Sequence, residues 1–212
     1  MRQFVTSHPL HRVALTAVML LATGAAQAVE EAEYTVVLED GDFEIREYAP
    51  SIVAETIVSG EFEDAGSRAF RKLFNYIDGE NHRSSEIAMT APVSQQAEGQ
   101  KIAMTSPVSQ EPTAQGWAVS FMMPAAYSMD TIPQPNDEQV VLREIPAYRA
   151  AAIRYSGTWS QKNYDEHLAE LQAWVVSMDL EAAGNPVWAR YNAPFTPWFM
   201  RRNEILIPLS GN

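Results

Sequence analysis

The feature that most constrains the fold is an internal repeat at a constant spacing of 97 residues. The segment "IREYAPSIVAETIVSGEF" (45–62) aligns without a gap with "LREIPAYRAAAIRYSGTW" (142–159). Arg-Glu meets Arg-Glu, Ser-Gly meets Ser-Gly, and Phe62 meets Trp159. A repeat that keeps its register over such a length indicates a duplicated structural unit. We therefore expect one domain over 29–212 with two similar halves, at about 33–125 and 138–210.

The first half has the pattern of three strands followed by a helix. The β-rich runs 34–40 ("YTVVLED") and 42–48 ("DFEIREY") flank Asp40-Gly41, a dipeptide typical of tight hairpin turns. The run 52–60 ("IVAETIVSG") predicts a third strand that ends at Gly60. Helical spacing of apolar residues follows, and Asp78-Gly79 predicts the end of that helix. The apolar positions are Phe62, Ala69, Phe70, Leu73, Phe74 and Ile77.

The second half repeats the pattern, with strands at 139–145 and 148–157 and a helix at about 160–178. Two further strands, 187–193 and 203–209, follow the helix. One apolar stripe defines the inner face of the helix: Tyr164, Leu168, Leu171, Val175 and Met178. Strand-rich halves that each carry one helix predict an α+β fold, in which two helices pack against a curved, barrel-like antiparallel sheet.

A nine-residue phrase occurs twice, as "IAMTAPVSQ" (87–95) and "IAMTSPVSQ" (102–110). Apolar residues alternate in both copies, so we predict that the copies pair as an antiparallel hairpin around Gly99 and close one side of the barrel. Pro92 and Pro107 cannot donate to a strand ladder and belong at an edge, a bulge or a strand end. A bulge at these positions would form the rim of a pocket.

The N-terminus has the three parts of a secretory signal peptide. Arg2 and Arg12 precede a 14-residue apolar run (13–26), and "AQA" ends at Ala28. We predict cleavage between Ala28 and Val29, export to the periplasm or beyond, and no stable membrane insertion afterwards. The alternative is an N-terminal anchor that is retained.

Charge and cysteine content limit the partners and the source of stability. Without Arg2 and Arg12 the chain keeps 13 basic and 27 acidic side chains, a net charge of −14. Such an acidic surface argues against nucleic acid and anionic membranes as partners. There is no cysteine, so an exported form depends on its core rather than on disulfides. The sequence leaves the oligomeric state open.

Six motifs in chain order carry a family resemblance: "FEIREYAP", "AFRKLFNYIDGEN", "IAMTAPV", "VSFMMP", "IRYSG" and "APFTPWFMRRNEILIPL". With them the chain resembles the SOUL, or heme-binding protein, family. The resemblance implies a pseudo-twofold distorted β-barrel flanked by two helices. It also implies that the chain binds heme or another tetrapyrrole in an apolar groove, and that it is not an enzyme.

The same resemblance leaves the ligand less certain than the fold. Similar barrels in bacterial effector-binding domains hold other hydrophobic, often cationic, small molecules. Some family members carry a histidine in the "IRxY" segment that has been proposed as an axial iron ligand, and here that position is Glu47. A carboxylate is a poor substitute for imidazole on heme iron, so histidine ligation of that type is in doubt.

The candidate ligand-binding residues are apolar or aromatic. Methionine adapts to flat ligands, so Met89 and Met104 of the doubled phrase are candidates, although methionine also fills irregular cores. Phe70 and Phe74 of the first helix, and Phe195 and Trp198 of the loop "APFTPWF", could stack on a flat ring. The aromatic loop could equally plug one end of the barrel.

Charged candidates lie close to that loop. Arg201 and Arg202 could pair with heme propionates, with Arg154 and Arg190 behind them, or could pair with the surplus carboxylates of the chain. Glu204 is costly if it points inward without a partner, and a buried carboxylate there would favour a cationic ligand.

Metal and catalytic signals are weak. His82 and His167 are the remaining histidines after the signal peptide, and neither has a second ligand at metal-binding spacing. No nucleophile elbow, "HExxH" or phosphate-binding loop occurs. We therefore expect a small-molecule binding protein. A pocket acid such as Glu204 acting as a base is the remaining route to an enzyme.

Overall fold

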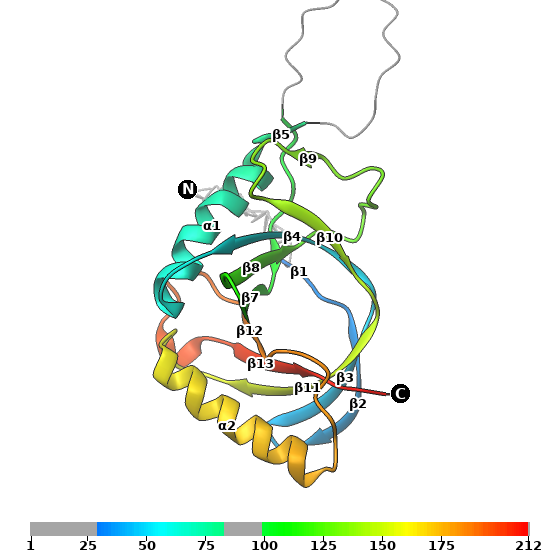
Figure 1. The fold of residues 1–212 in the computed structure, drawn as a ribbon, viewed down its shortest axis with the longest axis vertical. Coiled ribbons are helices and arrows are strands. Elements are labelled where there is room, and N and C mark those ends of the chain that lie inside the picture. The colour runs from blue at the N-terminus through cyan, green and yellow to red at the C-terminus, as the bar shows by residue number, and fades with distance from the viewer. Residues whose placement is uncertain (1–28, 83–98, 212) are drawn as a thin grey trace, which may run out of the picture.

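The structure is a computed structural model that describes residues 29–82 and 99–211. This part of the chain forms two long helices and one large curled sheet (Figure 1). The helices are α1 (Phe62–Asp78) and α2 (Gln161–Ser177), and a short 3₁₀ helix, η1, spans Trp198–Met200. The large sheet contains β2 (Tyr34–Asp40), β3 (Phe43–Tyr48), β4 (Ser51–Val58), β7 (Val108–Thr113), β8 (Gly116–Met122), β10 (Val141–Ile145), β11 (Tyr148–Tyr155), β12 (Val187–Arg190) and β13 (Asn203–Pro208). Four two-residue strands lie outside it: β1 (Glu30–Glu31), β5 (Asn81–His82), β6 (Thr105–Ser106) and β9 (Gln134–Pro135).

The order of the strands shows the twofold relation between the halves. The sheet runs β10-β4-β8-β7-β12-β13-β11-β3-β2, and every neighbouring pair is antiparallel. Counted outward from the β7–β12 junction, β7, β8, β4 and β10 on one side correspond in order to β12, β13, β11 and β3 on the other. The predicted α+β fold, a duplicated and distorted antiparallel half-barrel with two flanking helices, is confirmed.

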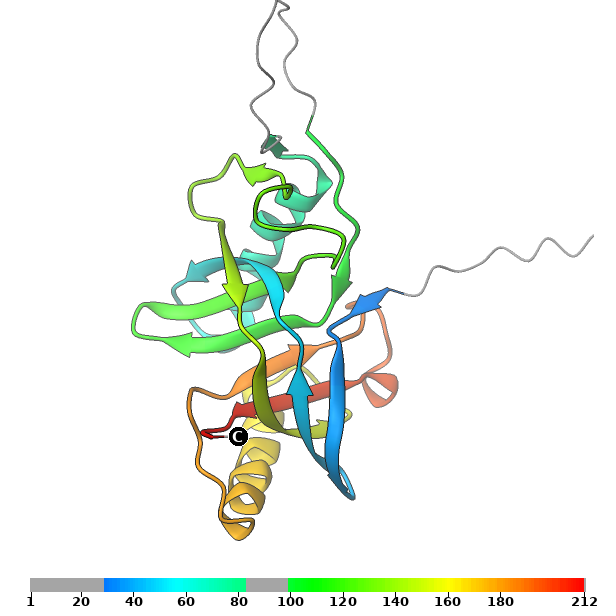
Figure 2. The same cartoon turned by 90° about the vertical axis from the view of Figure 1, so that its right-hand side faces the viewer.

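The strands of the two halves keep the spacing of 97 residues that the sequence repeat shows. β4 and β11 have equal lengths, and their bounds differ by 97 residues at both ends. Each half also gives one strand to the other: β3 pairs with β11, and β10 pairs with β4. The links Ala49-Pro50 and Pro146-Ala147 therefore carry the chain from one half of the sheet to the other. Figure 2 shows these strands crossing in front of the β7, β8, β12 and β13 strands.

The two helices cover one face of the sheet. Ala65, Ala69 and Leu73 of α1 lie in a buried core with Ala54 and Val119 of the strands beneath. α2 packs in the same way over the other half, with Leu171, Trp174 and Val175 against Ile153, Ile205 and Ile207. Each helix contributes a wholly buried leucine, Leu73 and Leu171, which alone is worth about 2 kcal/mol of transfer free energy. In the described residues, neither helix is long and apolar enough to cross a membrane.

The helix ends agree with the predicted start and stop residues. Ser160 caps α2, because its Oγ accepts a hydrogen bond from the backbone N–H of Asn163 at 3.3 Å. Gly79 ends α1 at a φ of 123°, a left-handed conformation that favours glycine.

The predicted pairing of the doubled phrase needs correction. The first copy, 87–95, lies wholly within 83–98, outside the described residues. In the second copy, Val108–Gln110 open β7, which pairs with β8 on one side and β12 on the other. The predicted hairpin between the copies is therefore wrong for these residues, because both edges of β7 are already taken. Pro107 does lie at a strand end, between β6 and β7.

Candidate functional site

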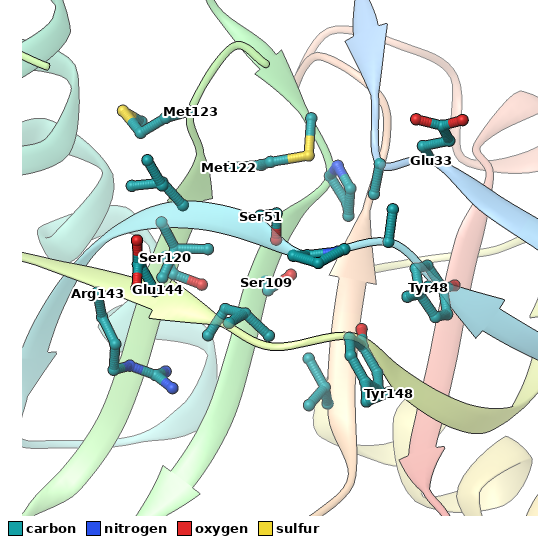
Figure 3. A pocket seen from close by; sticks show the side chains of 18 of the residues that line it. Glu33, Tyr48, Ser51, Ser109, Ser120, Met122, Met123, Arg143, Glu144 and Tyr148 are labelled. Atoms are coloured by element: carbon teal, nitrogen blue, oxygen red, sulfur yellow. The ribbon is translucent and has the colours of Figure 1, made fainter. Parts of the chain in front are cut away.

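The face of the sheet away from the helices lines an open groove of about 990 Å³. One wall comes from β7, β8, β12 and β13, and the other comes from the two crossings, around 48–53 and 143–148. Strand alternation creates the two faces: Val119 and Ile205 face the helices, while their neighbours Ser120 and Leu206 line the groove. Figure 3 shows Ser109, Ser120 and Met122 opposite the crossings that carry Tyr48 and Tyr148.

Small side chains at the centre of the groove leave its volume open. Ser109 of β7 and Ser120 of β8 lie directly opposite each other in the ladder, and Ala118 also lines the groove. Large residues at these positions would fill the space with the protein's own atoms. A pocket of this volume lies at the upper end of the range typical of small-molecule sites.

Flat aromatic and apolar side chains form much of the remaining wall. The rings of Tyr48 and Tyr148 stack with centroids 4.9 Å apart and planes 8° apart. Tyr48 ends β3 and Tyr148 begins β11, so each crossing contributes one tyrosine, although the spacing of 97 residues pairs Tyr48 with Ile145 and Tyr148 with Ser51. Burial raises the pKa of Tyr148 to about 12, which keeps its hydroxyl protonated at neutral pH. Met122, Val53 and Leu206 add apolar surface.

The charged residues that line the groove are mostly acidic. Among the residues that the structure describes, five are glutamates and one is a cation, Arg143; the glutamates are Glu30, Glu31, Glu33, Glu111 and Glu144. Arg143 forms an ion pair with Glu55 and lies 3.7 Å from Glu111. Burial, and then the charge of Glu55, raise the pKa of the Glu111 carboxyl above its ordinary value, although Arg143 opposes the shift.

A buried ion-pair network lies on the same side of the sheet. Glu204 is fully buried and accepts two hydrogen bonds from Arg46, at 2.7 and 3.2 Å. It also accepts one from the Tyr191 hydroxyl at 2.8 Å and one from Arg202 Nε at 2.9 Å. Burial opposes ionisation of Glu204, but the bond to Arg46 and the charges of Arg46 and Arg202 outweigh it, and the pKa of Glu204 lies below its ordinary value.

The structure shows where the predicted charged residues lie. Glu204 points inward, and protein groups already occupy its oxygens. Arg202 pairs with Glu204 and, at 2.7 Å, with Glu31. Arg201 donates to the carbonyls of Thr196 and Pro194 and covers the ring of Trp159 at 4.2 Å. Glu204, Arg201 and Arg202 are close together but are not among the residues that line the groove.

The predicted apolar residues lie elsewhere. Phe70 packs edge-on against Phe121 in the core under α1, and Phe74 is exposed on the same helix. Phe195 and Trp198 are exposed in the loop before β13, and Met104 is exposed before β6. None of these lines the groove. Met89 lies outside the described residues.

The two histidines lie apart from the groove. His82 is exposed, with Nδ1 2.8 Å from the Asn136 side-chain oxygen. His167 stacks on Tyr155, with ring centroids 4.0 Å apart, and its Nδ1 lies 2.7 Å from the Asn163 carbonyl oxygen. Within 29–82 and 99–211, no three His, Cys, Asp or Glu side chains form a group that could hold a metal ion.

The sequence did contain a signal for the groove residues that the prediction missed. Both crossings carry proline and alanine where the chain changes halves, in "EYAPS" and "EIPAY". The spacing of 97 residues pairs Pro50 with Ala147 and Ala49 with Pro146, and a proline in each link marks a strand break. Tyr48 and Tyr148 flank these breaks, and Arg143 lies in the strand that leads to the second of them.

The fold and the groove define the class of protein: a duplicated α+β half-barrel with helices on one face and a ligand-sized groove on the other. The model of the SOUL heme-binding protein family matches residues 29–208, and the chain belongs to this family, as the sequence motifs indicated.

Individual relatives agree with this assignment. The chain is 27% identical to heme-binding protein 2 of Homo sapiens over 195 residues, which cover 85% of this chain and 90% of the relative. It is 26% identical to heme-binding protein 1 of Xenopus tropicalis over 167 residues, covering 77% and 81% of the two chains. The C-terminal domain of EcmrR has a similar fold, with a TM-score of 0.50, 14% identity and coverage of 84% and 99%. At that identity the likeness to EcmrR shows the fold alone.

Proposed function

We propose that this protein binds heme or a related tetrapyrrole reversibly in the groove and serves as an exported carrier, buffer or sensor. The observation that carries the proposal is the open groove of about 990 Å³ with flat aromatic and apolar walls, in a chain of the SOUL heme-binding protein family. Ligand pockets of roughly 300–1,000 Å³ that are mostly apolar hold flat cofactor-sized molecules. The relatives named heme-binding proteins 1 and 2 support the same ligand class.

The described groove residues offer a surface for the tetrapyrrole ring but not the usual axial ligands of heme iron. Tyr48, Tyr148 and Leu206 offer flat or apolar surface for a ring. The described residues that line the groove include no histidine or cysteine. Met122 is the groove residue best suited to approach iron, because a thioether needs no deprotonation, whereas burial raises the pKa values of Tyr48 and Tyr148. Bound heme would supply a redox-active iron and a strong visible absorption.

Arg143 is the groove cation available to a propionate. Its side chain is about half exposed, so it can turn toward a ligand even though Glu55 and Glu111 share its charge. A charged hydrogen bond of this kind contributes about 1.5–3 kcal/mol. We propose binding rather than catalysis, because in the described part of the chain no groove serine forms a hydrogen bond with a carboxylate, and no histidine lines the groove.

A hemin titration of the mature chain, 29–212, tests the proposal. We expect a shift of the Soret band that saturates near one equivalent. Ser120→Phe should abolish most of the shift, because the new ring fills the centre of the groove. Thr35→Phe adds a similar ring at an exposed position of edge strand β2 and should bind like the wild type. Saturation in Ser120→Phe equal to that of the wild type would place the ligand elsewhere.

The five glutamates of the groove favour a second candidate, a flat hydrophobic cation. A porphyrin with cationic substituents has the shape of heme and the opposite charge, so a parallel titration separates the two. If it binds more tightly than hemin, and if Glu111→Gln plus Glu144→Gln reverses the order, the groove is a cation site. Tighter binding of hemin supports the tetrapyrrole carrier.

We also propose that the protein acts outside the cytoplasm, because residues 1–28 have the parts of a cleavable signal peptide. Intact mass measurement of the protein recovered from the periplasmic fraction should give a chain that begins at Val29. A mass that includes residue 1 would mean that the segment is retained.

A further inference from the structure

An exposed apolar surface is formed by residues that do not line the groove. We call residues 193–200 the aromatic loop. Its side chains are exposed by 90% for Phe195, 59% for Trp198, 60% for Phe199 and 65% for Met200. Single exposed apolar residues are common on proteins, but four large ones within six positions form a contiguous patch of the kind that marks an interaction surface.

The loop is held in shape by polar bonds, so its side chains do not collapse onto the core. The backbone N–H of Thr196 donates to the Ala193 carbonyl at 3.0 Å, and that of Met200 donates to the Pro197 carbonyl at 2.9 Å. Arg201 adds bonds to the carbonyls of Thr196 and Pro194, at 2.8 and 2.9 Å. A loop whose backbone is fixed from inside presents its apolar side chains to solvent at little further entropic cost on binding.

A polar pocket of about 440 Å³ adjoins the loop at Met200. Its charged lining residues are Arg154, Arg201 and Arg202 together with Asp42 and Glu170. Arg201 and Arg202 are already engaged. The exposed Arg154 guanidinium makes no hydrogen bond or ion pair with any residue in the described part of the chain. Its donors can therefore bind an external anion.

The start of the chain lies on the same side. The Glu31–Arg202 ion pair, at 2.7 Å, holds β1 beside the residues that follow the aromatic loop. Figure 2 shows β1 and η1 toward the same side of the molecule. The apolar run 13–26 ends only a few residues before Val29. The first described residue, Val29, therefore lies three positions after the apolar run and on the side of the molecule that carries the aromatic loop.

We propose that the aromatic loop and the Arg154 pocket form a surface that docks on a phospholipid bilayer. Tryptophan and phenylalanine favour the bilayer interface, where the ring meets the acyl boundary. The Arg154 guanidinium binds the lipid phosphate through charged hydrogen bonds. The contact is shallow and peripheral, and it does not depend on what the groove binds.

The net charge selects the kind of bilayer. The charge of −14 that argued against anionic membranes is spread over the whole surface and is screened beyond roughly 8 Å at physiological salt. It still repels a strongly anionic surface. The bilayer is therefore mainly zwitterionic lipid, in which the phosphate is the anion within reach of Arg154.

Cosedimentation with phosphatidylcholine vesicles tests the proposal with the chain 29–212. This chain keeps every described helix and strand and all residues of the buried cores, and circular dichroism verifies its fold. We expect the wild type to sediment with the vesicles. The triple variant Phe195→Ser, Trp198→Ser and Phe199→Ser should bind at least about tenfold more weakly, since it loses the inserted apolar area. Arg154→Gln should bind about five- to tenfold more weakly, because it loses the phosphate contact.

Matched variants distinguish binding through this surface from non-specific adsorption to vesicles. Val36→Ser, Val37→Ser and Val176→Ser together remove three exposed apolar side chains elsewhere, and Lys162→Gln removes another exposed cation. Both should bind vesicles like the wild type. Failure of the wild type to sediment, or equal binding of the aromatic triple variant, overturns the proposal. Stronger binding to pure phosphatidylglycerol than to phosphatidylcholine overturns the choice of a zwitterionic surface.

Discussion

The Glu204 carboxylate illustrates what a buried charge requires. It is wholly inaccessible to solvent, yet three side chains donate four hydrogen bonds to it. Taking a carboxylate and a guanidinium out of water costs several kcal/mol each, which close pairing repays. The network joins β3 of the first half to β13 of the second, so it fixes how the halves meet.

Removing one partner of this network should be far more costly than removing two. We expect Arg46→Met to lower the free energy of unfolding by about 3–5 kcal/mol, because Glu204 is left buried with less compensation. The double variant Arg46→Met, Glu204→Leu should recover much of that loss, since no carboxylate remains to be paired. Urea denaturation at pH 7 measures both. Additive losses in the double variant would contradict this account.

The lowered pKa of Glu204 predicts how stability depends on pH. The group has an ordinary pKa of 4.5 when unfolded and a lower one when folded. Its stabilising contribution is therefore complete above 4.5 and is lost as the pH falls through the folded value. The difference in unfolding free energy between the wild type and Glu204→Gln should be constant from pH 7 to 5.5 and shrink below about 4.5. Denaturation series across this range test it, and a constant difference down to pH 3.5 would refute it.

Sequence patterns could place Glu204 but could not identify its partner. A glutamate within "NEILIPL" needs a partner for its charge if its side chain points inward. Its main partner, Arg46, lies 158 residues away, on a strand of the other half. No local period encodes such a contact. For Arg201 and Arg202 the sequence left two alternatives, a ligand's propionates or the chain's own carboxylates. Arg202 pairs with two carboxylates of the chain, and Arg201 donates to two backbone carbonyls.

At the scale of elements, helices were predicted more accurately than strand partners. Local signals define a helix, and both helices begin and end within about two residues of their predicted limits. The buried faces differ from the prediction at three residues. Trp174 is buried although it lies off the predicted apolar stripe, whereas Met178 and Phe74, on the predicted apolar faces, are exposed. Strand pairing depends on distant segments, so the doubled phrase was expected to pair with itself, whereas β7 pairs with β8 and β12.

The two helices differ at their N-termini, which gives an internal control. Ser160 caps α2 with its side chain, whereas Glu61 at the start of α1 makes no such bond. Ser160→Ala should lower the free energy of unfolding by about 1 kcal/mol, because the N–H of Asn163 loses its acceptor. Glu61→Ala should change it much less. Thermal melts of both variants compare them directly, and equal losses would mean that the cap is not the cause.

At the scale of the whole molecule, the repeat predicted two similar halves but not how they exchange strands. The gapless spacing of 97 residues reveals a duplication, and β4 and β11 keep this spacing at both ends, although both strands end two residues before their predicted limits. Whether each half pairs within itself depends on the two short links, Ala49-Pro50 and Pro146-Ala147. These links send the chain across the molecule. The groove forms because they cross above the sheet, and for that reason its residues escaped prediction.

Strand exchange predicts that neither half folds alone. Without the second half, β3 loses β11 and β4 loses β10, so both strands of the first crossing lose a ladder partner. The Glu204 network is divided as well, because Arg46 and Glu204 belong to different halves. We expect residues 29–125 and 138–212, expressed separately, to show no cooperative thermal transition by circular dichroism, whereas 29–212 unfolds in a single step. Mixing the two fragments should restore part of the transition, because each supplies the strand that the other lacks. An isolated half that unfolds cooperatively would show that its strands can pair internally, and the groove would then not depend on the crossing.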